Sequence, residues 1–195
     1  MLTERFERAL ILATRLHASQ TRKVVGVPYL SHLLAVTSIA MEHGADEDEA
    51  IAALLHDAVE DQGGAKTLAR IEREFGPRVA AIVDGCTDTD QTPKPPSQPR
   101  KEAYIARIRA GEEPHGPSIR LVSCADKLHN ARSVLNDHYR IGEEVWDRFA
   151  GGKTGTLWYY RALHDAYTRF DTNSLTDALD RVITELEQRA RAAGA

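Results

Sequence analysis

Cysteines, aromatic residues and long apolar runs are all scarce in this chain, and each shortage narrows the class of protein. Its 195 residues include two cysteines, Cys86 and Cys124, which form no CxxC pair and no disulfide framework. This usage suits a reducing cytosol, so we expect a cytoplasmic protein. The first twenty residues carry acidic side chains and no long apolar run, so we expect neither a signal peptide nor a membrane span.

An excess of basic residues is also missing. Lysine and arginine number 25 against 29 aspartates and glutamates, which gives a net charge of −4 with neutral histidines. This balance argues against a non-specific nucleic-acid binder, because such binding depends on many cations that neutralise phosphates. A site for a small anionic ligand must therefore be a local basic cluster.

Helix-forming residues dominate what is present. Alanine, leucine, glutamate and arginine are abundant, 42% of the residues are apolar and only 6% are aromatic, which predicts an all-α fold. The length predicts a single domain, residues 1–195, with a substantial core. We expect a last amphipathic helix, at about 174–193, to be an appendage of this domain.

The spacing of apolar residues predicts about ten helices and no strand. Their ends are set by caps and breakers, such as the Asp46-x-x-Glu49 capping box and the glycines Gly44 and Gly76. The helices are expected at residues 3–19, 30–42, 47–61, 67–75, 77–84, 100–110, 118–136, around Trp146 and Phe149, 156–170 and 174–193.

The stretch AALLHDAVED, residues 52–61, carries the strongest chemical signal. On one continuous helix its apolar residues share one side, and His56, Asp57, Glu60 and Asp61 share the other. One imidazole and three carboxylates at such close range are costly unless a cation lies among them or the face is fully solvated. A metal site and a solvated helix face are both open interpretations at this point.

Two further residues have the right chemistry to complete a metal site. His32 lies in the first turn of the helix at 30–42, where a lone histidine is more often structural than a ligand. Asp126 follows a nearly apolar run and shares a helix face with Asn130, so we expect it to be buried. A buried aspartate needs an arginine, backbone donors or a metal.

Cations gather at two loops. Arg22-Lys23 stands beside Gly26 in a loop that can cradle an anion, although surface pairs of this kind are common. Lys94 lies in the loop between Cys86 and Pro99, where four prolines in seven residues argue against a helix. A long loop in a compact domain is either a lid or binding loop, or disordered.

Taken together, these motifs resemble the HD superfamily of metal-dependent phosphohydrolases, in which separate helices contribute His, His-Asp and Asp. The closer similarity is to the hydrolase domain of the Rel/Spo alarmone enzymes. Because no synthetase or regulatory region follows, the chain is more similar to stand-alone small alarmone hydrolases. The matching motifs are Arg22-Lys23 with Gly26-x-Pro28-Tyr29-x-x-His32, then His56-Asp57-x-x-Glu60-Asp61, and finally Ala125-Asp126-Lys127-Leu128-x-Asn130.

The resemblance implies a helical HD bundle that holds one Mn²⁺ per chain. Its ligands would be His32, His56, Asp57 and Asp126, and mixed imidazole and carboxylate donors with open water positions suit Mn²⁺. Glu60 and Asp61 would activate water for attack on the 3′-pyrophosphate of ppGpp or pppGpp, which yields GDP or GTP and pyrophosphate. The implied substrate contacts are Arg22, Lys23, Asn130, Lys94 and, more weakly, Lys153.

Two other functions fit the same motifs. One is a phosphohydrolase of adenosine alarmones or another nucleotide, because nothing in the basic loop selects guanine. The other is a sensor that holds a metal and a nucleotide without turnover, although a sensor has no need of the water-activating pair. Each of these functions has a small-molecule nucleotide as partner, and the sequence leaves the oligomeric state open.

Overall fold

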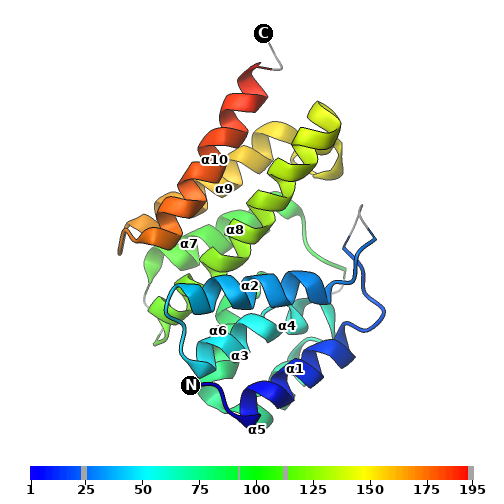
Figure 1. Ribbon diagram of the computed structural model, residues 1–195, viewed down its shortest axis with the longest axis vertical. Helices are drawn as coiled ribbons and strands as arrows, with labels where there is room; N and C mark the ends of the chain where they lie inside the picture. Colours follow the sequence, from blue (N-terminus) through cyan, green and yellow to red (C-terminus); the bar gives the residue numbers. More distant parts are fainter. Residues whose placement is uncertain (23–25, 92, 112–113, 193–195) are drawn as a thin grey trace. The chain divides into compact units, whose positions relative to one another are not determined.

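The computed structural model describes residues 1–22, 26–91, 93–111 and 114–192 (Figure 1). These residues form α-helices, one 3₁₀ helix and no strand, which confirms the all-α prediction; an isolated bridge pairs Thr21 with Pro28. The elements are α1 (Glu4–Leu16), α2 (Leu30–Glu42), α3 (Glu47–Leu55), α4 (Ala58–Asp61), α5 (Ala65–Phe75), α6 (Pro77–Cys86), α7 (Ser97–Ala110), α8 (Gly116–Ile141), η1 (Gly142–Arg148), α9 (Gly152–Thr168) and α10 (Ser174–Ala192).

The helices form two compact units. The first comprises residues 1–95 and 112–125, and therefore contains α1 to α6 and the first part of α8. The second comprises residues 96–111 and 126–195, with α7, the rest of α8, η1, α9 and α10. In the described part of the chain, no helix has the length and apolar character needed to cross a membrane. The single-domain expectation stays a prediction.

Helix α3 is the centre of the first unit. It packs against α1, α2 and α6 (Figure 1), and every residue from Ala50 to Leu55 is fully buried. A helix that is apolar all round needs neighbours on all sides, and the run AIAALL meets that requirement. The predicted capping box is present, because Asp46 accepts from the Glu49 N–H at 3.0 Å and Glu49 from the Asp46 N–H at 2.8 Å.

The helix predicted over 47–61 is interrupted at His56 and Asp57, and this is a correction to the sequence analysis. Helix α3 ends at Leu55 and the single turn α4 begins at Ala58. In a continuous helix the Ala53 carbonyl would accept from the N–H of Asp57, but here His56 Nδ1 donates to it at 2.8 Å. Asp57 takes φ −95° and ψ −1°, a sparsely populated region in which many active-site residues lie.

Several other predicted bounds also change. Helix α7 begins at Ser97 rather than Arg100, because Pro99 is tolerated in a first turn, where the N–H groups have no intrahelical partner. Helix α8 begins at Gly116 and continues to Ile141, and the segment with Trp146 is a 3₁₀ helix, η1, that ends before Phe149.

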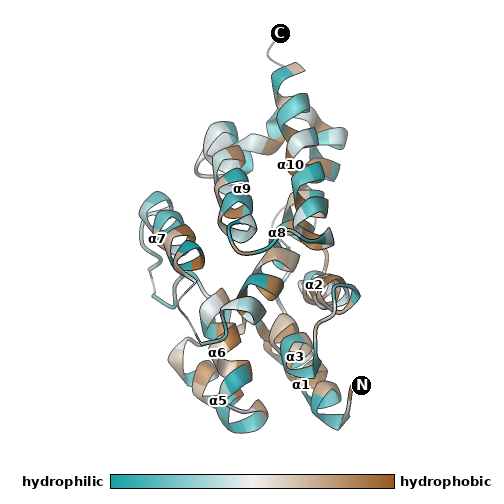
Figure 2. Ribbon diagram, turned by 90° about the vertical axis from the view of Figure 1, so that its left-hand side faces the viewer, coloured by the Kyte–Doolittle hydropathy of each residue, from teal (hydrophilic) through white to brown (hydrophobic). Residues whose placement is uncertain are grey.

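Helix α9 organises the second unit. It packs against α7, η1 and α10, and Leu163, Leu179 and Ile183 between these helices are fully buried. The predicted amphipathic character of α10 is visible in Figure 2, where teal and brown residues follow each other along the helix. Arg161 of α9 also pairs with Asp180 at 2.5 Å and Glu187 at 3.0 Å, which ties α10 to the unit.

Asp46 provides a test of how α3 is stabilised. It caps the helix and pairs with Arg78 Nη1 at 2.6 Å. Asp46→Ala should lower the free energy of unfolding by about 1 kcal/mol, the usual contribution of a cap, as measured by urea denaturation. Asp46→Asn keeps a capping oxygen and should lose less. Equal losses at neutral pH would mean that the charge, and not the cap, stabilises the helix.

The stability difference between wild type and Asp46→Asn should also depend on pH. Burial alone would raise the pKa of Asp46, but the Glu49 N–H and the Arg78 guanidinium together hold it below the usual value. A carboxyl with a lowered folded pKa stabilises fully above its unfolded pKa and loses that effect as the pH falls through the folded value. The stability difference between wild type and Asp46→Asn should therefore shrink below about pH 4.

Candidate active site

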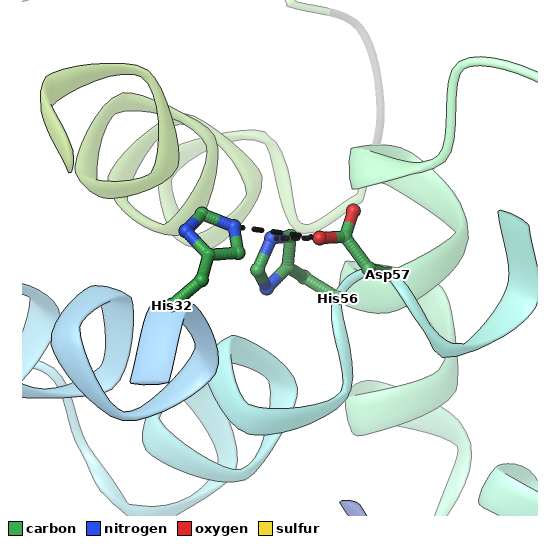
Figure 3. Close-up of side chains that lie close together, drawn as sticks. All are labelled: His32, His56 and Asp57. Carbon is green, nitrogen blue, oxygen red and sulfur yellow. Dashed lines mark ion pairs between the residues drawn. The ribbon is translucent and has the colours of Figure 1, made fainter. Parts of the chain in front are cut away.

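Two histidines and one aspartate converge in the first unit. His32 projects from α2, His56 from the end of α3 and Asp57 from the α3–α4 junction, and all three point toward one another (Figure 3). Asp57 Oδ2 lies 3.0 Å from His56 Nε2 and 3.4 Å from His32 Nε2. Both imidazoles are buried, whereas the Asp57 side chain is 19% exposed. The cluster therefore has one side open to solvent.

The orientation of the cluster is set by its neighbours. A carbonyl oxygen only accepts, so the contact with Ala53 places a proton on His56 Nδ1 and leaves Nε2 facing the cluster. The Tyr29 hydroxyl donates to Asp57 Oδ2 at 2.6 Å. A ligand histidine whose other nitrogen donates to a carbonyl is the usual arrangement in protein metal sites.

These donors fit a divalent metal ion. One ligand atom from each of His32, His56 and Asp57 can be chosen so that all lie within 4.8 Å of one another. With Nδ1 protonated, neutral His56 presents a lone pair to a carboxylate oxygen, an arrangement that a cation between them stabilises. Imidazole and carboxylate donors suit Zn²⁺, Fe²⁺ and Mn²⁺, and the absence of thiolates argues against a closed structural zinc site.

Asp126 lies in the second unit, at the start of that unit's segment 126–195, and it is 6% exposed. From the sequence we expect an arginine, backbone donors or a metal beside it. Its contacts in the structure include the Lys127 ammonium and the Asn130 amide, which donates at 2.6 Å. Burial alone would lower the pKa of Lys127, but the Asp126 carboxylate keeps it well above the ordinary value. The role of Asp126 as a metal ligand stays a prediction.

The acidic pair follows the cluster on α4 and contacts a lysine. Lys94 Nζ lies 2.6 Å from Glu60 Oε1 and 3.3 Å from Asp61 Oδ1. Burial, and then the negative charge of Asp88, raise the pKa of Glu60, although Lys94 opposes both effects. A carboxyl with a raised pKa is a better proton acceptor near neutral pH than an ordinary one. The sequence predicts Lys94 as a phosphate contact and gives no sign of this ion pair.

The remaining predicted substrate contacts lie in different parts of the chain. Arg22 is half-buried in the loop between α1 and α2, and Lys23 lies outside the described residues. Asn130 and Lys153 belong to the second unit, where Lys153 Nζ pairs with Glu143 Oε2 at 2.6 Å. Their roles in substrate binding stay predictions.

Sequence reasoning assigned no role to two residues that contact the site, Tyr29 and Gln20. Tyr29 belongs to the motif that ends at His32 and precedes that histidine by three residues, a spacing that places both on one face of a helical turn. Gln20 donates to Asp61, which is 41 positions away, and no local pattern signals such a contact.

The geometry predicts one divalent metal per chain. Elemental analysis of protein purified without chelator should find it, and His32→Ala, His56→Ala or Asp57→Ala should lower Mn²⁺ affinity by more than the 10–100-fold typical of an outer-shell change. His43→Ala, at the end of the same helix as His32, is the matched control and should bind as wild type does. A folded, active protein that holds no metal, even after Mn²⁺ is added, would contradict the prediction.

Curated proteins resemble the chain over about two thirds of its length. It is 36% identical over 131 residues to the guanosine-3′,5′-bis(diphosphate) 3′-pyrophosphohydrolase of Aquifex aeolicus, a match that covers 67% of this chain and 18% of that protein. It is 38% identical over 128 residues to a probable GTP pyrophosphokinase of Mycobacterium leprae, with 66% and 16% covered. The chain therefore spans about a sixth of the length of these relatives.

A solved structure resembles it over nearly its full length. That protein is described as a metazoan ortholog of SpoT that hydrolyzes ppGpp and plays a role in starvation responses. The TM-score is 0.73 at 26% identity, and the match covers 95% of this chain and 97% of the other. The HD domain family matches residues 9–156, a range that includes the cluster and the acidic pair. The chain therefore belongs to the HD domain family.

Proposed function

We propose that this protein hydrolyses the 3′-pyrophosphate of guanosine alarmones, ppGpp and pppGpp, and releases GDP or GTP with intact pyrophosphate. The observation that carries the proposal is the cluster of the buried His32 and His56 with the partly exposed Asp57, followed within one helical turn by Glu60 and Asp61. Similarity to a 3′-pyrophosphohydrolase and to a structure described as hydrolyzing ppGpp supports this choice of substrate.

The metal in this proposal is one Mn²⁺, held by His32, His56 and Asp57, with Asp126 as the fourth ligand. When bound, it lowers the pKa of a coordinated water and stabilises negative charge on the phosphate. Glu60 and Asp61 are the catalytic carboxylates: one accepts the proton of the attacking water and the other orients that water. The raised pKa of Glu60 supports Glu60 as the acceptor.

The reaction balances without a further reagent. The water oxygen forms a bond to the phosphorus attached to the 3′ oxygen, and the bond between that phosphorus and the 3′ oxygen breaks. The water proton passes to the acidic pair, and the leaving 3′ oxygen takes up a proton to become a hydroxyl. Pyrophosphate departs with its internal P–O–P bond intact.

Basic residues would hold the substrate's other phosphates. We assign this role to Arg22, Lys23 and Lys94, with Asn130 and Lys153 as further contacts. A guanidinium binds phosphate in a bidentate, oriented manner, whereas a lysine acts as a point charge. Since Lys94 already pairs with Glu60 and Asp61, the substrate phosphates would compete with these carboxylates for its ammonium. A cytoplasmic location is part of the proposal and is supported by the cysteine usage.

The acidic pair should be separable from the metal ligands. Glu60→Gln and Asp61→Asn should each keep Mn²⁺ affinity and the fold but lower kcat by about 10²–10⁴-fold, the usual contribution of acid–base catalysis. Glu72→Gln, an exposed substitution on α5, is the control and should leave kcat unchanged. If either variant loses its metal, that residue must be reassigned as a ligand.

Product analysis tests the reaction itself. Mn²⁺-loaded protein incubated with ppGpp should give equal amounts of GDP and pyrophosphate, measured by ion-exchange chromatography. Orthophosphate alone would indicate a different phosphohydrolase, and a parallel assay with the adenosine analogue would measure base preference. Tight binding with every nucleotide recovered unchanged would leave the sensor as the function.

A further inference from the structure

Gln20 contacts the acidic pair from the loop that follows α1. Its Nε2 donates to Asp61 Oδ2 at 2.8 Å, and its Oε1 accepts from Gln62 Nε2 at 2.6 Å. His17 Nδ1 lies 2.7 Å from the same Oε1. Because a carboxylate only accepts, the amide group can point only one way, so His17 Nδ1 must carry the proton and donate. Three hydrogen bonds therefore fix the Gln20 amide.

Tyr29 makes the corresponding contact with the cluster of His32, His56 and Asp57. Its hydroxyl donates to Asp57 Oδ2 at 2.6 Å, and its ring packs edge-on against His32 with the ring centroids 5.3 Å apart. On its other side the ring stacks on His17, at 5.3 Å and an interplanar angle of 19°. His17 is 2% exposed, so this stack is part of the packed interior.

The two sets of contacts share His17 and form one continuous frame. We propose that Gln20 is the positioning residue for Asp61 and Tyr29 is the positioning residue for Asp57, and that His17 couples the two. Neither Gln20 nor Tyr29 is assigned to the metal or to the substrate. The inference rests on the proposed function, since it treats Asp57 as a ligand and Asp61 as a carboxylate that acts on water.

Asp61 needs such support because of where it lies. It is the last residue of α4, which has four residues, and a helix this short has little stability of its own. The other Asp61 oxygen, Oδ1, accepts from Lys94, the lysine that substrate phosphates would compete for. With Lys94 engaged elsewhere, the Gln20 amide would keep Oδ2 in place. A carboxylate held in one rotamer orients its water without a reorganisation cost.

Gln20→Ala tests the first half of the proposal. It should lower kcat by about 10–100-fold, the range for outer-shell partners, with KM for ppGpp and Mn²⁺ affinity within about twofold of wild type. Gln98→Ala is the matched control, because Gln98 makes the same kind of bond, 2.8 Å to Glu102 on α7, and pairs with neither Asp57 nor Asp61. A general structural defect would lower the melting temperature and move all three constants together.

Tyr29→Phe tests the second half, since it removes the hydroxyl but keeps the ring that stacks on His17. Mn²⁺ affinity, measured by calorimetric titration, should fall by about 10–100-fold, and kcat at saturating Mn²⁺ should stay near that of wild type. Unchanged far-ultraviolet circular dichroism would show that the fold is kept. This readout needs no turnover.

Four results would overturn parts of the proposal. A kcat for Gln20→Ala within twofold of wild type, or a Mn²⁺ affinity that falls as far as kcat does, rejects the role of Gln20. Wild-type Mn²⁺ affinity in Tyr29→Phe rejects the role of Tyr29. Wild-type protein without activity on ppGpp rejects the proposed function and Gln20's role with it, whereas Mn²⁺ binding by Tyr29→Phe still decides the role of Tyr29.

Discussion

The convergence of two buried imidazoles on one carboxylate oxygen is the constraint on which the site depends. Asp57 Oδ2 has His56, His32 and the Tyr29 hydroxyl within 3.4 Å, so its charge is largely shielded from water and must be compensated locally. The Tyr29 hydroxyl supplies one hydrogen bond to this oxygen, and a cation between the carboxylate and the lone pair of His56 would supply the rest. The packing of α1, α2 and α6 on α3 holds these side chains in place.

The break between α3 and α4 follows from the same constraint. A helix carried through His56 and Asp57 would place their side chains 100° apart, whereas the observed junction brings the carboxylate to the two imidazoles. The buried run AIAALL fixes the end of α3, and the His56 imidazole takes part in bonding the Ala53 carbonyl. The local loss of helical regularity is therefore what assembles the cluster, and it places the acidic pair on a separate turn.

The sequence predicts the fold class, most helix bounds and the residues of the cluster, because these depend on local periodicity, caps and short motifs. The Asp46 capping box and the bounds of α2 are direct outcomes of such signals. The helix break depends on the His56 side chain, which competes with a backbone N–H for the Ala53 carbonyl. A pattern of apolar and polar residues does not represent such competition. The bond from Gln20 to Asp61 joins residues 41 positions apart, and Lys94 meets Glu60 across 34. Contacts of this kind arise from tertiary packing and produce no periodic pattern in the sequence.

Because α3 is buried and Lys94 is exposed, the two parts of the site move on different timescales. Backbone that is wholly enclosed in a core exchanges its amide protons only when the protein opens extensively, so His56, at the end of α3, is held for about as long as the fold persists. The Lys94 side chain is 43% exposed, and exposed side chains change rotamer in picoseconds to nanoseconds. The site thus combines a histidine that stays in place for as long as the protein is folded with a cation whose side chain can change partners on a much shorter timescale.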